Sequence, residues 1–165
     1  MQPLVTRRLI LRPIELSDFE SLCLLYGDVE VMKYVTGKPR TREKTQQRLA
    51  AHVKQHTQFG FGLCAAISKN ENRFIGRCGL EPRLEPRGLS GELAWMFVPS
   101  YWGKGLATES AKALIQFAKA RLEIHRIFAT ADHRNIASIA IMKKLGMSLV
   151  REDSRGVEYE IIGDS

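Results

Sequence analysis

A short glycine-containing turn between a predicted strand and a long predicted helix constrains this chain most. The strand is the apolar segment 89–98, and the helix begins at Leu106. Gly103 and Gly105 lie between them, and neither glycine nor proline occurs again before Gly146. Glycine lets the backbone approach a ligand closely, and the free N–H groups at a helix start attract anions. The turn YWGKGLATES therefore indicates either an anion-binding loop or an ordinary strand-to-helix connection.

Two familiar phosphate-binding motifs do not match this turn. A Walker A loop requires serine or threonine directly after Gly-Lys, whereas Gly105 follows Lys104 here. A dinucleotide-binding fingerprint requires a third glycine where Thr108 stands. The amides of residues 103–108 nevertheless precede the strongest helix of the chain, whose dipole is positive at this end. Their position favours the anion-binding interpretation.

Length and composition indicate one globular domain that spans residues 1–165. The chain is long enough for a substantial core, with 44% hydrophobic and 26% charged residues. No segment is long and apolar enough to span a membrane, and the apolar run near the N-terminus is too short for a signal peptide. We therefore expect a cytoplasmic protein whose cysteines are buried free thiols, namely Cys23, Cys64 and Cys78.

The net charge of +7 permits an anionic partner, such as nucleic acid, an acidic protein or a phosphorylated cofactor. The basic residues are scattered along the chain, with no long run of lysine and arginine. A general nucleic-acid-binding role is therefore only weakly supported.

The periodicity of the chain predicts an α/β (α+β) fold, in which helices flank a mixed, mostly antiparallel twisted sheet. Ser17 is expected to cap the first helix, and Leu93, Trp95 and Phe97 are expected to share one buried strand face. The predicted strands are 7–14, 61–68, 73–82, 89–98, 125–131 and a final pair within 148–162. The predicted helices are 17–28, 41–57, 106–122 and 135–147.

Two segments together resemble the GNAT acetyltransferase superfamily, in particular the branch that contains the ribosomal-protein N-terminal acetyltransferases. The first is YWGKGLATES after a strand ending in FVPS, and the second is HRIFATADHRNIASIAIMKKLGM. The loop motif of that superfamily, [Arg/Gln]-x-x-Gly-x-[Gly/Ala], falls on residues 102–107, with Trp102 in the first position, Gly105 as the matched glycine and Ala107 last. The second block matches at Asn135, Ser138, Lys144, Gly146 and Met147. The order of predicted elements from Arg7 to Ile162 agrees as well.

The resemblance implies acetyl-CoA as co-substrate, without a metal, because backbone amides and a helix dipole supply the positive field for its pyrophosphate. The pantetheine arm would lie beside the strand that ends at Val98, with Asn135 contacting it from a neighbouring element. Lys104 either touches a phosphate or faces solvent. The residues expected to bind the cofactor are Met96, Phe97, Val98, Trp102, Gly103, Lys104, Gly105, Leu106, Ala107, Thr108 and Asn135.

Acyl transfer to an amine requires a proton acceptor for the amine and a way for the sulfur to leave. The resemblance makes Glu92 the candidate base, and the alternatives are a solvated strand-end carboxylate or an anchor for the substrate amine. Many family members carry a tyrosine seven residues after the asparagine, where this chain has Met142, which cannot donate a proton. Ser138 is the candidate acid in its place, and its alternative is a local hydrogen bond to the helix backbone.

Two further features are expected to have no catalytic role. His52 and His56 lie four residues apart, but Val53 stands where a zinc-binding H-E-x-x-H motif needs glutamate, so we expect a surface pair. Glu109 lies in the first turn of the helix after the glycines, where a carboxylate complements the helix dipole.

These features together predict an N-acetyltransferase that moves acetyl directly from acetyl-CoA to a primary amine. The acceptor remains open among protein N-terminal amines, polyamines, amino acids and aminoglycosides, and a ribosomal protein is one candidate partner. The protein is expected to be a monomer or a homodimer. The alternative is a non-catalytic acyl-CoA-binding or RNA-associated module, suggested by the missing tyrosine and the basic charge. The acceptor cleft is expected to use the loop VTGKPR and the loops of the late strands, whose shapes depend on the fold.

Overall fold

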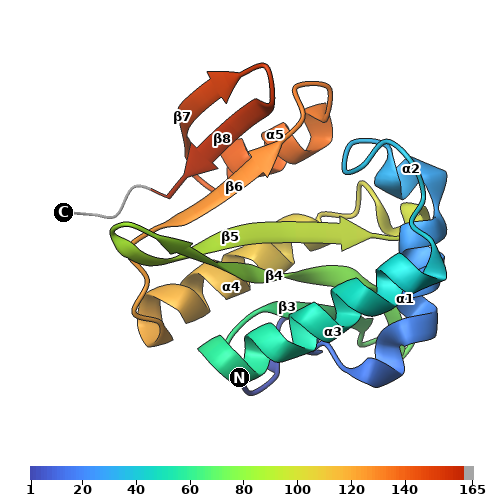
Figure 1. Cartoon of the computed structure of the whole chain (residues 1–165). Coiled ribbons are helices and arrows are strands. Elements are labelled where there is room, and N and C mark those ends of the chain that lie inside the picture. The colour runs from blue at the N-terminus through green and yellow to red at the C-terminus, as the bar shows by residue number, and fades with distance from the viewer. Residues whose placement is uncertain (162–165) are drawn as a thin grey trace.

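An eight-stranded sheet forms the centre of the structure, a computed structural model that describes residues 1–161 (Figure 1). The strands follow the order β1-β2-β3-β4-β5-β6-β8-β7. Their bounds are β1 Leu4–Val5, β2 Leu9–Pro13, β3 Leu63–Ser68, β4 Arg73–Glu85, β5 Gly88–Phe97, β6 Ile127–Ala131, β7 Ser148–Asp153 and β8 Gly156–Glu160. The helices are α1 Phe19–Gly27, α2 Val29–Met32, α3 Arg42–Phe59, α4 Leu106–Arg121 and α5 Ile136–Lys144, with 3-10 turns η1 Leu16–Asp18 and η2 Pro99–Tyr101. The predicted mixed, mostly antiparallel α/β architecture is confirmed.

The sheet opens between β5 and β6, its one parallel pair of neighbours within residues 1–161. These strands pair only where Gly91 faces Ile127 and Glu92 faces Phe128. Past that point β5 stays with β4 as far as Phe97, whereas β6 follows β8, and the two strands diverge (Figure 1). The backbone edge of β5 from residue 93 onward therefore faces an open wedge.

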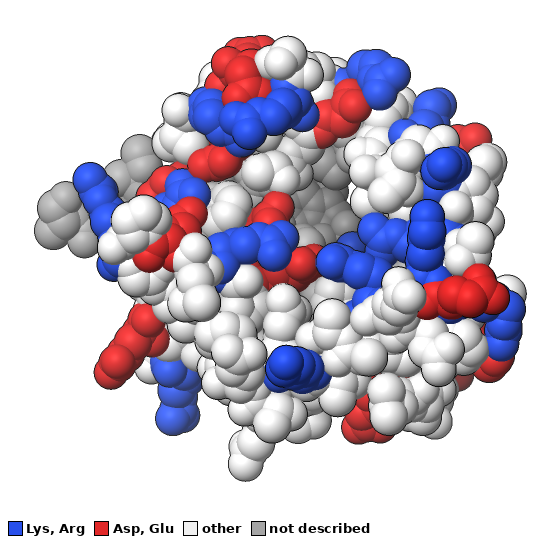
Figure 2. Space-filling view, viewed as in Figure 1, with Lys and Arg blue, Asp and Glu red and all other residues white. Residues whose placement is uncertain are grey.

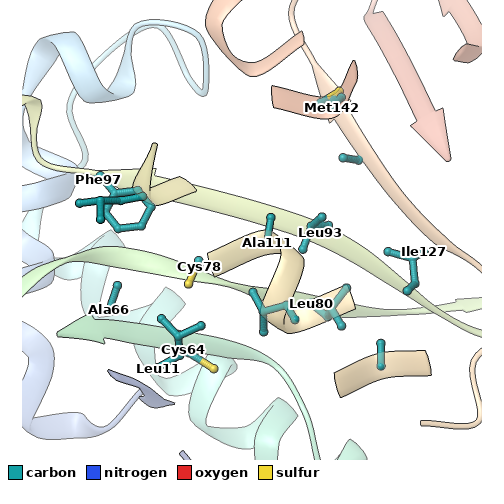
Figure 3. Packing of buried hydrophobic residues seen from close by; sticks show 14 of the residues in the cluster. Leu11, Cys64, Ala66, Cys78, Leu80, Leu93, Phe97, Ala111, Ile127 and Met142 are labelled. Carbon is teal, nitrogen blue, oxygen red and sulfur yellow. The ribbon is translucent and has the colours of Figure 1, made fainter. Parts of the chain in front are cut away.

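The main core lies between the sheet and α4, which runs behind the sheet in Figure 1. Ala111, Leu114 and Ala118 recur at helical spacing and are each 1% exposed. Figure 3 shows Ala111 beside Leu93 of β5, and Phe97 further along the same strand. Trp95 is partly buried against this cluster, so the predicted common face of the three β5 side chains is confirmed.

Helices α1, α2 and α3 cover the opposite face of the sheet and enclose a second apolar cluster. It contains Leu22, Leu25, Met32 and Leu49, and Met96 joins it from β5. Because successive strand side chains alternate between faces, Met96 points away from the α4 side. The second face of the sheet therefore borders both these helices and the wedge.

The start of α1 differs from the prediction, since Ser17 does not cap it. Ser17 lies inside η1, and the residue that precedes α1 is Asp18. The Asp18 carboxylate accepts the backbone N–H of Glu15 at 2.8 Å and pairs with Arg12 at 2.7 Å. A buried carboxylate held by a guanidinium makes stronger bonds here than a serine hydroxyl does. Sequence spacing alone does not reveal this partner on β2.

Three elements were missed or shortened by the periodicity analysis. β1 and α2 have two and four residues, too few to show a repeat. β4 continues to Glu85, past the predicted end at Pro82, because it pairs with β5 along its whole outer half.

Cys64 and Cys78 are buried free thiols as predicted, whereas Cys23 is only partly buried. No helix within residues 1–161 has the length and apolar character needed to cross a membrane.

Candidate active site

The glycines of the loop between β5 and α4 are required by its backbone. Gly103 has φ of 71° and Gly105 has φ of 74°, both in the left-handed region that L side chains rarely adopt. Gly105 is the residue immediately before α4. The chain therefore turns sharply out of η2 and directly into the helix.

The loop fits an anionic group by its free donors. Within the described residues 1–161, the backbone N–H groups of residues 103–108 have no backbone acceptor, whereas Glu109 N–H already bonds Gly105 O at 3.0 Å. A Cβ added at Gly105 would approach only Arg8 Nη2, at 3.7 Å, so the space beside the loop is open. Six free amides at the positive end of a sixteen-residue helix suit the pyrophosphate of acetyl-CoA.

Side chains fasten this loop from two sides. Trp102 Nε1 donates a hydrogen bond to Phe97 O at 2.7 Å, which ties the loop to the end of β5. Arg8 Nη1 donates to Lys104 O at 2.8 Å, and Arg8 Nε pairs with Glu109 at 2.7 Å. Lys104 itself is exposed, with its ammonium 4.9 Å from the centroid of the Tyr101 ring.

Glu109 anchors the N-terminal segment of the chain to the first turn of α4. Its carboxylate accepts hydrogen bonds from Thr6 Oγ1 at 2.6 Å and from Arg8 N at 2.8 Å, in addition to the ion pair. Burial alone would raise the pKa of Glu109, but these bonds outweigh it and hold the pKa below its ordinary value. The predicted structural role of Glu109 is confirmed.

A cleft of about 430 Å³ occupies the wedge where β5 and β6 diverge. Figure 2 shows the same face of the molecule as Figure 1. This face has a hollow between the α2 and α5 sides, and lysine and arginine side chains lie at the edge of the hollow. Four predicted site residues line the cleft, namely Glu92, Met96, Asn135 and Ser138. Phe97, Val98 and residues 102–108 lie outside this lining, and the Phe97 side chain is in the main core.

Glu92 is held by two partners instead of standing free at a strand end. Its Oε2 accepts hydrogen bonds from Nε of Arg83, at 2.8 Å, and from Nη2 of the same guanidinium. Its Oε1 accepts the Thr130 hydroxyl at 2.8 Å, across the wedge from β6. The side chain is 19% exposed, so the solvated-carboxylate alternative is wrong. Oε2 uses both of its lone pairs on Arg83, whereas Oε1 retains one that a ligand amine can use.

Asn135 and Ser138 stand together at the start of α5. Asn135 Oδ1 accepts the backbone N–H of Ser138 at 3.2 Å, which caps the helix. The Ser138 hydroxyl has no hydrogen-bond partner within residues 1–161, so the predicted local alternative does not occur there. Met142, one turn further on, is 1% exposed and packs in the main core. Ser138 is therefore the hydroxyl that α5 presents to the cleft.

A buried charged cluster on β4 and α3 forms the part of the cleft wall that the sequence did not reveal. Arg77, Glu81 and Arg83 alternate along β4 and therefore share one face. Burial alone would raise the pKa of Glu81, but Arg77 leads a group of neighbouring cations that lower it below its ordinary value. The alternation of charged residues within an otherwise apolar strand was the available signal. A strand buried by helices on this face would be expected to carry apolar residues there.

The histidine pair of α3 differs from the prediction, because it is not on the surface. His52 is 1% exposed, beneath the β4 cluster, and burial followed by the charge of Arg77 lowers its pKa to about 4. His56 is partly buried, and its Nε2 lies 2.6 Å from Leu63 O on β3. The side of α3 that carries the two histidines instead faces a polar part of the protein interior. No group of three or more potential metal ligands occurs within the described part of the chain.

The fold, the amide loop and the adjoining cleft define an acyltransferase with a CoA-type donor. Residues 8–148 match the family model of the acetyltransferase (GNAT) domain. The chain therefore belongs to the GNAT family of acetyl-CoA-dependent N-acetyltransferases. The resemblance to the GNAT superfamily, inferred from the two motifs, is confirmed.

Relatives and solved structures agree with this assignment. The uncharacterized N-acetyltransferase YnaD of Bacillus subtilis is 30% identical over 87% of this chain and 81% of its own. Spermidine N(1)-acetyltransferase of Escherichia coli is 26% identical over 86% and 74%, respectively. An acetyltransferase of Agrobacterium tumefaciens aligns with a TM-score of 0.85 at 24% identity, covering 99% of this chain and 95% of that one. The ribosomal L7/L12 α-N-protein acetyltransferase RimL, solved with coenzyme A, aligns with a TM-score of 0.79 at 19% identity, covering 96% of each chain.

Proposed function

We propose that this protein acetylates a primary amine bound in the cleft between β5 and β6, by direct transfer within a ternary complex. The observation that carries the proposal is that Glu92 and Ser138 line one cleft from opposite sides of the wedge. The free amides of residues 103–108 would bind the pyrophosphate of acetyl-CoA, and the unpaired edge of β5 would bind its pantetheine arm. Acetyl-CoA supplies the activated acetyl thioester.

Glu92 is proposed to orient the acceptor amine and to take its proton. Arg83 and Thr130 fix the carboxylate in one position, which favours orientation of a bound amine. The lone pair left on Glu92 Oε1 is the acceptor available for the amine proton. An amine bound close to it needs to lose its proton only as the new bond to carbon forms.

Ser138 is proposed to donate a hydrogen bond to the sulfur as it departs. Its unpartnered hydroxyl on the cleft wall supports this role, and its backbone N–H is already used by Asn135. A thiol with a pKa of about 8.5 needs little help to leave as thiolate, so a hydroxyl suffices. Met142 lies in the core and contributes no donor.

A thiol-release assay with acetyl-CoA and a panel of primary amines tests this function. The panel contains amino acids, short peptides with free N-termini, spermidine and an aminoglycoside, with titration calorimetry of acetyl-CoA run in parallel. We expect tight binding and amine-dependent release of thiol. Acetyl-CoA binding without release for any amine would instead support a non-catalytic acyl-CoA-binding module.

A further inference from the structure

We propose that the acceptor is a primary amine that also carries a carboxylate, as an amino acid does, and that Arg77 binds this carboxylate from the α3 side of the cleft. The inference rests on the proposed function, because it names the acceptor class of the same site. Arg77 has guanidinium nitrogens without a hydrogen-bond partner in the described part of the chain.

Arg77 is buried but poorly satisfied. Its side chain is 7% exposed and borders the cleft, and its Nε and Nη1 have no hydrogen-bond partner within residues 1–161. The nearest carboxylate oxygen to Nη1, Glu81 Oε1, is 3.9 Å away, too far for a hydrogen bond. Buried charged groups in folded proteins are normally both paired and hydrogen-bonded. The Tyr26 ring also packs against the guanidinium, with its centroid 5.8 Å from Cζ, but it is no carboxylate. A ligand carboxylate in the cleft would provide the anionic partner that Glu81 is too far away to be.

The residues around Arg77 add positive charge that Glu81 alone does not balance. Arg48 Nη2 lies 3.7 Å from Glu81 Oε2, and Arg83 Nη2 lies 3.3 Å from the same oxygen. Arg40 packs its guanidinium 4.9 Å from the centroid of the Tyr26 ring. Nε of Arg48 and Nη1 of Arg40 are also buried without a hydrogen-bond partner in the described chain. His52 beneath them has a pKa of about 4 and so is neutral at neutral pH.

On the opposite wall of the cleft, around β6, β7 and β8, the charged side chains are paired with one another. Arg151 pairs with Asp153 and with Glu158 at 3.0 Å, and Arg155 pairs with Asp153 at 2.9 Å. Asp132, which also lines the cleft, is paired with an exposed arginine at 2.8 Å. An anionic group is therefore drawn to the Arg77 side, where donors are unpaired.

Different residues of the cleft thereby recognise the two ends of the acceptor. Glu92 offers a lone pair of Oε1 to the amine, and the β4 and α3 arginines offer hydrogen-bond donors to the carboxylate. A planar guanidinium matches a carboxylate with two parallel hydrogen bonds, which selects for that group as well as binding it. The charged groups of polyamines and aminoglycosides are all cationic, and the same arginines repel them.

The wild-type test compares matched acceptors. Each of several amino acids is assayed against its own carboxamide, with spermidine as the cationic comparison, by thiol release at fixed acetyl-CoA. We expect kcat/KM for the best amino acid to exceed that of its carboxamide by about tenfold to a hundredfold, as for hydrogen bonds to a charged group. Equal values for the pair, or a preference for spermidine, would overturn the inference and leave the proposed function intact.

Arg77→Met removes the charge while keeping a long side chain. It is expected to lower kcat/KM for the amino acid by about tenfold to a hundredfold, to change that for the carboxamide by less than about threefold, and to leave acetyl-CoA affinity unchanged. Arg73→Met is the matched control, because Arg73 lies on the same strand with a side chain that is 60% exposed. Both variants are checked for cooperative thermal unfolding.

Arg48→Met provides a second variant if Arg77→Met does not fold, since the Arg48 side chain is 43% exposed. Arg48→Met is also expected to lower kcat/KM for the amino acid more than for its carboxamide, but by a smaller factor than Arg77→Met. Equal losses for amino acid and carboxamide in a folded variant would contradict carboxylate recognition. Absence of acetyl transfer to any amine by the wild-type protein would instead count against the proposed function itself.

Discussion

Arg8 Nε donates a 2.7 Å hydrogen bond to Glu109 Oε2, and this ion pair joins the segment before β2 to the first turn of α4. The same arginine reaches Lys104 O through Nη1. One side chain therefore holds both the glycine loop and the helix that begins there. The pair therefore restrains a loop that contains two left-handed glycines.

Glu109→Ala is expected to lower the free energy of unfolding by about 1–3 kcal/mol and to weaken acetyl-CoA binding, because Thr6 and Arg8 lose their shared acceptor. Chemical denaturation and titration calorimetry measure the two effects. Glu123→Ala is the control, since Glu123 is exposed just beyond the other end of α4. Unchanged affinity with reduced stability would show that the ion pair supports the fold but not the loop.

Gly105→Val is expected to weaken acetyl-CoA binding while the protein stays folded. A left-handed φ costs an L residue about 1–2 kcal/mol, so the loop would shift away from the shape that gathers its amides. Gly105→Asn is expected to bind better than Gly105→Val, because asparagine tolerates this region. Gly27→Val, at a glycine without positive φ, serves as the control for substitution in general. The idea fails if calorimetry gives the folded Gly105→Val variant wild-type affinity.

Glu92→Gln is expected to reduce kcat by about 10²–10⁴-fold with little change in acetyl-CoA affinity. Glutamine keeps one acceptor oxygen for Arg83 and can turn its amide N–H to the Thr130 oxygen, but it cannot take a proton. Thr130→Val removes only one orienting bond and is expected to have a smaller effect on kcat. Steady-state rates across a pH range distinguish the roles, and equal turnover at every pH would leave Glu92 as an ion-pair partner of Arg83.

Ser138→Ala is expected to slow turnover by about tenfold to a hundredfold without changing stability. The helix cap uses the backbone N–H of Ser138, which the substitution retains. Asn135→Ala, by contrast, removes the cap and is expected to destabilise the protein by about 1 kcal/mol. Full activity in Ser138→Ala would mean that water or the acceptor amine protonates the sulfur.

His52 predicts a pH dependence of stability. Its folded pKa of about 4 lies below the ordinary value of 6.5, so between these pH values the unfolded chain binds a proton that the folded chain does not. The stability of the wild-type protein should therefore fall as the pH decreases from about 6.5 towards 4. His52→Gln is expected to flatten this slope, and His133→Gln, at an exposed position, is not. Identical slopes in all three proteins, measured by urea denaturation, would contradict the assignment.

Local sequence patterns were sufficient to predict the fold and the glycine loop between β5 and α4. The amphipathic repeat of α4, the β5 segment and the glycine turn between them each involve residues close in sequence. Hydrophobic periodicity and backbone requirements report on such neighbours directly. The glycine turn was therefore recognised from residue type and spacing, and the positive φ of Gly103 and Gly105 agrees with it. The cap formed by Asn135 was not predicted, and its contact with the donor stays a prediction.

Only the tertiary structure decided what the acceptor side of the cleft is made of. Arg77 and Glu81 meet Arg48 and His52 because β4 packs beneath α3, and Glu92 meets Thr130 because β6 lies beside β5 only at its beginning. These contacts join residues far apart in the chain, and neither spacing nor composition encodes which strand faces which helix. The histidines of α3 were expected at the surface because a sequence shows that a residue is polar but does not show which residue it pairs with. The loop proposed to bind the donor is a local structure, whereas the charged groups proposed to meet the acceptor are brought together by packing.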